Sequence, residues 1–241
     1  MLVLGPGGPR LIVAGAAGDG VTAVITGALT NALPAQGQAV SVETVHPFAR
    51  GYAHGLILFF VVLAVVISTF VAQALVGPRS DTGFRARLIV LVVYGSLSPL
   101  VGMATAAWIA GGYGSGFWAA AGLVGLASAA IGAVVAGSAR LLGTVGVGLA
   151  ALLVVLLDLV ASGGPIGSQL LPDLYRWLAP GMPAGQLYSA VRGALYYDNA
   201  GLGIPIGVLS AWLAGGLVLM VLGEIVARRS RVRGSRPVSA Q

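Results

Sequence analysis

The sequence contains no cysteine, no lysine and few charged residues of either sign. All 13 basic residues are arginines, set against 7 acidic residues, and charged residues make up only 8% of the 241-residue chain, whereas 57% are hydrophobic. A soluble domain is typically about one quarter charged, so this composition excludes an ordinary water-soluble globule. The mean hydropathy of +0.95 indicates an integral membrane protein.

The missing residue types also exclude several kinds of chemistry. Without cysteine the chain has no disulfide, no thiolate nucleophile and no cysteine-ligated zinc or iron–sulfur site. Without lysine it has no Walker A loop of its own, because that motif needs a lysine to reach the nucleotide phosphates. Neither G-x-S-x-G nor H-E-x-x-H, two common hydrolase motifs, occurs in the sequence. We therefore expect a protein that is not an enzyme.

Five stretches are long and apolar enough to cross a bilayer. A hydrocarbon core about 30 Å thick requires roughly 20 apolar residues in helical form. None of the five contains an internal arginine, and their only acids, Asp158 and Glu224, lie near segment ends. The pattern predicts an all-α polytopic membrane protein with five transmembrane helices. The predicted spans are residues 56–76, 88–110, 117–137, 141–161 and 204–227.

The distribution of arginine favours one orientation, because short cytoplasmic loops retain positive charge. Nine arginines fall on one side of the predicted spans, while the two in the long outer loop are balanced by two aspartates. We expect a multi-pass protein of a bacterial inner membrane, with its N-terminus outside and its C-terminus in the cytoplasm. The basic tail then serves as a topology signal in contact with lipid, and we expect no nucleic-acid binding. The nine are Arg79, Arg85, Arg87, Arg140, Arg228, Arg229, Arg231, Arg233 and Arg236.

The residues before the first span predict a small α/β segment outside the membrane. Apolar runs at residues 11–14 and 39–45 indicate strands, and residues 19–33 indicate a helix between them. We interpret this segment as the remnant of an extracytoplasmic domain and expect an upstream span in the natural protein or its ancestor. The predicted organisation is a remnant at 1–52, a membrane domain at 53–227 with an outer loop at 162–203, and a basic cytoplasmic tail at 228–241.

Two patterns near the N-terminus imitate ligand sites. Glycines within residues 15–20 imitate a dinucleotide fingerprint, but Ala23 replaces its third glycine and one βαβ unit cannot form the required sheet. A candidate metal site could consist of Glu43, His46 and His54. However, His46 precedes a proline and is therefore expected to be extended. We favour turn-forming glycines and a juxtamembrane segment, and we expect no cofactor and no metal.

Asp158 and Glu224 are the acids most worth testing, because an ionisable group within a span is by default a functional hypothesis. Both lie within a turn of the predicted membrane interface, where the cost of inserting a charge falls. We favour an interfacial or helix-end role for each over substrate or proton handling.

Small residues recur at every fourth position of the third predicted span. Such a ridge lets a second helix approach closely, and it predicts a tight bundle or a subunit interface. The ridge consists of Ala121, Gly125, Ala129, Ala133 and Gly137.

The outer loop is too polar to cross the membrane but too apolar and aromatic for an ordinary loop. Four prolines divide it, and residues 168–178 and 186–197 can each form a short amphipathic helix with interfacial tyrosines and a tryptophan. Re-entrant helices that shape an exit route and surface helices that anchor the protein both fit this pattern.

Residues 178–198, just before the last span, resemble the proline-then-arginine segment of type-2 ABC exporter permeases. The resemblance is closer still to the YhgE/Pip (phage infection protein) branch of that superfamily, which residues 162–172 and 45–51 also resemble. Members of that branch have an N-terminal span, a large extracytoplasmic domain and five further spans, so this chain resembles their C-terminal half over most of residues 39–227. By position, the loop motif falls on Pro180, Pro183, Tyr188 and Arg192, which we expect to shape an outer gate.

The resemblance implies a permease-like subunit of an export system. It further implies energy from a separate ATP-binding subunit, for which the loop carrying Arg79, Arg85 and Arg87 is the expected cytoplasmic coupling site, and assembly as a homo- or hetero-oligomer. The lack of charge deep in the spans favours hydrophobic or lipid-like cargo. The same lack favours the alternative, a non-transporting membrane scaffold, receptor or secretion-apparatus component, over a transporter of polar solutes.

Overall fold

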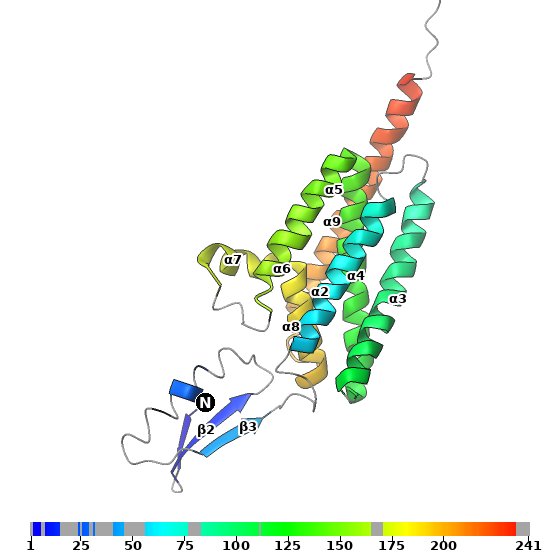
Figure 1. Ribbon diagram of the computed structural model, residues 1–241. Coiled ribbons are helices and arrows are strands. Elements are labelled where there is room, and N and C mark those ends of the chain that lie inside the picture. The colour runs from blue at the N-terminus through cyan, green and yellow to red at the C-terminus, as the bar shows by residue number, and fades with distance from the viewer. Residues whose placement is uncertain are drawn as a thin grey trace, which may run out of the picture.

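A computed structural model describes residues 2–5, 8–14, 24, 26–28, 31, 41–45, 56–76, 83–110, 112–164 and 171–234. Five helical segments among them are long and apolar enough to cross a membrane, which confirms the predicted all-α polytopic fold (Figure 1). They are α2 (Leu56–Val76), α3 (Phe84–Ala110), α4 (Phe117–Leu142), the continuous run α5–η5–α6 (Thr144–Ala150, Ala151–Leu157 and Asp158–Ala161) and α9 (Gly203–Gly234).

The hydrophobic stretches locate the helices well but not all of their ends. The boundaries of α2 agree with the prediction, whereas α3 and α4 extend past the predicted spans to include Arg85, Arg87 and Arg140. The last helix, α9, likewise continues into the basic tail. Arginine is a good helix former, so the helices continue after the apolar sequence has ended.

Helix α4 is the centre of the bundle. It contacts α2, α3, α8 and α9, and 72% of its apolar window is buried, against 39% or less for each of the other four spans. The ridge of small residues permits this packing: a Cβ atom added to Gly137 would lie 2.9 Å from the carbonyl oxygen of Gly216 on α9. A Cβ atom added to Gly125 would lie 3.0 Å from the carbonyl oxygen of Gly95 on α3. The predicted close approach is therefore an approach within the bundle.

The outer loop contains α7 (Asp173–Leu178), the short η7 (Ala179–Gly181) and α8 (Pro183–Tyr196). Helix α7 buries none of its residues, whereas α8 buries eight and packs against α2, α4, α6 and α9. Figure 1 shows α8 running from the end of α6 towards the end of the bundle at which α2 begins. The second predicted amphipathic helix thus lies inside the bundle.

The fourth crossing is consequently built from two pieces. The run from Thr144 to Ala161 has 18 residues, about 27 Å of helix at 1.5 Å per residue. Helix α4 has 26 residues, or about 39 Å on the same basis. The 14 residues of α8, about 21 Å in length, fill the part of the bundle that the shorter run leaves open.

The N-terminal strands form a three-stranded sheet in the order β1 (Leu2–Gly5), β2 (Gly8–Ala14) and β3 (Ser41–Val45). Strands β1 and β2 are antiparallel, and β2 and β3 are parallel with helical residues between them. The predicted strands are confirmed at residues 11–14 and 41–45, and residues 39 and 40 of the second prediction lie outside the described residues. Strand β1 was not anticipated because its apolar run is too short to show alternation. The glycines within 15–20, as well as Ala23, His46 and His54, lie outside the described residues.

Two adjacent glycines of α9 offer a matched test of the helix packing. A Cβ atom at Gly216 would lie 2.6 Å from the backbone nitrogen of Val134, whereas one at Gly215 would meet nothing within 4 Å. Gly216→Ala should lower the free energy of unfolding by about 1–3 kcal/mol, because α4 and α9 must separate. Gly215→Ala should leave it unchanged or raise it by up to about 1 kcal/mol, since alanine favours the helix. Unfolding in detergent micelles measures both, and equal effects would contradict the packing.

Candidate functional site

Asp158 joins the two pieces of the fourth crossing. Its side chain is completely buried, and Oδ1 accepts a 2.8 Å hydrogen bond from the backbone N–H of Ala184. Ala184 is the second residue of α8, and the first N–H groups of a helix have no acceptor within that helix. Asp158 therefore caps α8 from another helix, and its carboxylate lies at the positive end of the α8 dipole.

The position of Asp158 differs from the expected one. The sequence placed it within a turn of the membrane interface, but α8 continues the crossing beyond it, so Asp158 lies at the break between two helices. Asp158 therefore lies at a helix end, but that end is in the interior of the bundle. Oδ2 has no hydrogen-bond partner among the described residues, and neither α2 nor the rest of the run from Thr144 to Ala161 contains a titratable side chain.

The helix leading to Asp158 is irregular. Residues Ala151–Leu157 form a π-helix, a rare geometry that often occurs at functional sites. After Ala161 the chain turns away through Gly163 and Gly164, whose φ angles are +68° and +43°. The hydroxyl of Ser162 donates to the carbonyl oxygen of Leu159 and accepts from the Gly164 N–H. These bonds give partners to backbone groups at the helix end that would otherwise be unpaired in hydrocarbon.

The two motif prolines lie at the entrance to α8. Pro183 is the first residue of the helix, where its missing N–H costs nothing. Pro180 lies in η7, and its carbonyl oxygen accepts a 2.8 Å hydrogen bond from Nε2 of Gln186. The neighbouring carbonyl of Gly181 accepts a 2.8 Å bond from Nε1 of Trp212 on α9. The turn is thereby attached to both α8 and α9.

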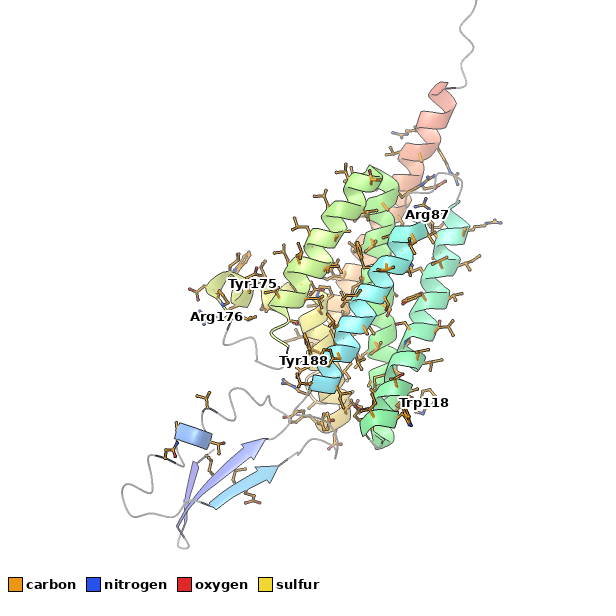
Figure 2. The ribbon with its side chains drawn as sticks, viewed as in Figure 1. Arg87, Trp118, Tyr175, Arg176 and Tyr188 are labelled. Atoms are coloured by element: carbon orange, nitrogen blue, oxygen red, sulfur yellow. The ribbon has the colours of Figure 1, made fainter. Side chains whose placement is uncertain are left out.

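Tyr188 and Arg192 lie one turn apart on α8. The guanidinium carbon of Arg192 lies 5.7 Å from the centre of the Tyr188 ring, which is the geometry of a cation–π interaction. Tyr188 is buried in the bundle, whereas Arg176 is exposed on the projecting helix α7 (Figure 2). The structure therefore brings two residues of the resemblance motif into direct contact.

Three further tyrosines lie near the end of α8. Burial raises the pKa of the Tyr113 hydroxyl above its usual range, and the proximity of Tyr196 raises it further. Burial also raises the pKa of Tyr197, an effect that the positive charge of Arg192 partly offsets. The sequence contains no indication that Tyr113, in the turn before α4, has a buried hydroxyl, because an uncharged turn contains no pattern that distinguishes a buried tyrosine from an exposed one.

Glu224 lies at the opposite end of the bundle and connects two helices. Its Oε2 lies 3.0 Å from Nη2 of Arg140 on α4, and its Oε1 lies 3.1 Å from Nε of Arg228 on α9. The Arg140 and Glu224 side chains are only 10% and 17% exposed. This geometry gives Glu224 a helix-end role in an ion pair between α4 and α9.

The expected coupling residues are not all on the surface. Arg85 is exposed, whereas Arg87 is only 2% exposed. Arg79 lies outside the described residues. Arg87 is buried because α3 begins before it and carries it into the bundle.

Among the described residues, no group of three or more histidine, cysteine, aspartate or glutamate side chains could hold a metal ion. The chain matches no protein-family model, no curated protein and no solved structure. The five apolar helices nevertheless define its class, a multi-pass membrane protein in contact with the lipid bilayer.

Substitution of Asp158 tests the capping role. Asp158→Ala should leave the Ala184 N–H buried without an acceptor, a cost of about 1–3 kcal/mol, so the first-turn amides of α8 should exchange hydrogen about tenfold faster or more. Asp158→Asn keeps an acceptor oxygen and should exchange more slowly than Asp158→Ala. Asp173→Ala, on the exposed α7, is the matched control. Hydrogen exchange measured by mass spectrometry would contradict the role if the Ala and wild-type proteins behaved alike.

Proposed function

We propose that this chain is a permease-like transmembrane subunit of an export system in a bacterial inner membrane. It moves hydrophobic or lipid-like cargo with energy from a separate ATP-binding subunit. The observation that carries the proposal is the broken fourth crossing, in which α8 is buried in the bundle and is joined to α6 through the Asp158 carboxylate. Discontinuous helices of this kind form substrate sites and moving elements in many transporters.

The resemblance of residues 178–198 to type-2 ABC exporter permeases, and more closely to the YhgE/Pip branch, supports the same proposal. Its motif residues coincide with the entrance and the inner face of α8 rather than with an exposed loop. Pro183 and Tyr188 are buried, and Tyr188 contacts Arg192. We infer that these residues set the position of α8 as an outer gate.

The nature of the cargo follows from the interior of the bundle. Most buried side chains around α8 are aliphatic or aromatic, and the ion pairs of Glu224 lie at the opposite end of α9. The buried polar side chains of the described spans are mostly uncharged, namely Thr69, Gln73 and Ser128, beside Asp158 and Arg87. A pathway for a charged solute needs polar groups along its length. The described interior therefore fits an apolar molecule better than an ion or a sugar.

The sequence contains no lysine and hence no Walker A loop, and we assign ATP binding to a separate subunit. Arg85, Arg228 and Arg229 are exposed at the arginine-rich end of the bundle, the end that the charge distribution assigns to the cytoplasm. A partner with an acidic docking surface would complement it. We retain Arg85 as a proposed coupling residue. Arg87 is buried, so we assign it a structural role in α3 and no contact with the partner.

The alternative is a non-transporting scaffold, receptor or secretion-apparatus component. Helix α7 favours it, because Leu174 and Trp177 are 61% and 79% exposed on an element that projects from the bundle (Figure 2). A partner protein at the outer side could bind this helix. In that case α8 would be a fixed support for α7.

The gate residues distinguish the two functions. Arg192→Ala removes a cation–π contact worth about 0.5–2 kcal/mol, and Pro183→Ala loosens the entrance to α8. Both should lower efflux of a lipophilic fluorescent dye severalfold without loss of membrane insertion. Arg176→Ala, on the exposed α7, should behave as wild type. Wild-type efflux in both gate variants, together with purification from native membranes without an ATP-binding subunit, would favour the scaffold.

A further inference from the structure

An apolar groove lies on the side of the bundle between α2 and α3. It has a volume of about 770 Å³, opens outward from the bundle, and is lined by one face of α2 from Phe60 to Ala72 and by Tyr94 of α3. Both helices are among the candidate membrane spans, so the groove faces the hydrocarbon of the bilayer. Water does not fill such a groove, and molecules of the bilayer reach it directly.

The α2 wall offers almost nothing polar to a ligand. Its single hydroxyl, that of Ser68, donates back to the carbonyl oxygen of Ala64 one turn earlier and is also near that of Val65. Phe60, Ile67 and Val71 supply large apolar surfaces on the same face. This wall fits the body of a hydrocarbon chain.

Tyr94 is the exception. Its hydroxyl takes part in none of the hydrogen bonds found among the described residues. The residue lies six positions after Leu88, where the apolar part of α3 begins, and sixteen before Ala110, about 9 Å and 24 Å along the helix axis. Tyr94 therefore lies in the half of the membrane nearer the arginine-rich end, and a hydroxyl without an acceptor in hydrocarbon is unfavourable. A ligand with an acceptor would remove that cost.

We propose that the groove binds an uncharged lipid-like molecule from within the bilayer, its apolar body along α2 and its ester or ketone oxygen accepting a hydrogen bond from Tyr94. The inference rests on the proposed function and specifies the class of its cargo. A charged headgroup is disfavoured because no charged side chain lines the groove to pair with it. A second copy of the chain would bring only its own apolar helix face, which leaves the Tyr94 hydroxyl unsatisfied.

Photochemical crosslinking of the purified full-length chain in phosphatidylcholine nanodiscs tests the site. The probe is a diacylglycerol with a diazirine in one acyl chain, and the crosslinked residues are mapped by mass spectrometry. We expect crosslinks on the Phe60 to Ala72 face of α2. Tyr94→Phe should weaken competition by unlabelled diacylglycerol about 5- to 10-fold, the equivalent of one hydrogen bond.

Matched controls separate the hydrogen bond from the groove itself. Ala64→Trp and Ala72→Trp each fill the groove and should abolish labelling of the α2 face, whereas Val93→Trp, exposed on α3 but outside the groove, should not. A diazirine-bearing alkane, which has no acceptor, should label wild-type and Tyr94→Phe proteins equally.

Three outcomes would overturn the proposal: labelling spread evenly over all lipid-facing residues, a Tyr94→Phe protein indistinguishable from wild type with the diacylglycerol probe, or crosslinks that join two copies through the groove. The binding assay involves no transport and no ATPase. Intact groove labelling in a chain that exports nothing would therefore refute the proposed function alone. Efflux without groove labelling would refute this inference alone.

Discussion

The structure depends on the absence of water in hydrocarbon, which obliges each buried backbone group to find its partner within the protein. Helices α2, α4 and α9 meet this requirement through their own hydrogen bonds, whereas α3 contains Pro99, which has no N–H to donate to the carbonyl of Gly95. The fourth crossing does not meet it in this way, because it stops at Ala161 and resumes at Pro183. The bond from the Ala184 N–H to Asp158 and the bonds around Ser162 are what make that interruption tolerable. The structure thus explains why one acidic residue, Asp158, occurs in an otherwise apolar sequence.

The two ends of the bundle are held together by different means. At the arginine-rich end, Glu224 joins α4 and α9 through ion pairs, and glycines let the same two helices pack in close contact. At the other end, α8 is held by the hydrogen bond from the Ala184 N–H to Asp158, by the bond from Trp212 of α9 to the Gly181 carbonyl at its entrance, and by apolar packing. Motion of α8 would break few polar contacts but would disturb the packing of its eight buried residues.

Much of this architecture was readable from the sequence, because the length of an apolar stretch is fixed by the thickness of the hydrocarbon. The boundaries of α2 followed in this way, and the close approach at Gly137 followed from the ridge of small residues. The burial of α8 did not, since an amphipathic pattern looks the same on a membrane surface and in a cleft between helices. The burial of Arg87 and the capping by Asp158 depend on contacts between distant parts of the chain, and no local pattern encodes them.

Because the natural chain lacks cysteine, single cysteines introduced into intact cells test the central claim, that α8 is an internal part of a five-span bundle, most directly. The readout is reaction with a membrane-impermeant maleimide at Ala190 of α8, which is fully buried, and at the exposed positions Ala200 and Arg229. The account predicts labelling of Ala200→Cys in intact cells, of Arg229→Cys only after permeabilisation, and of Ala190→Cys in neither condition. Labelling of Ala190→Cys in intact cells as fast as that of Ala200→Cys would contradict it.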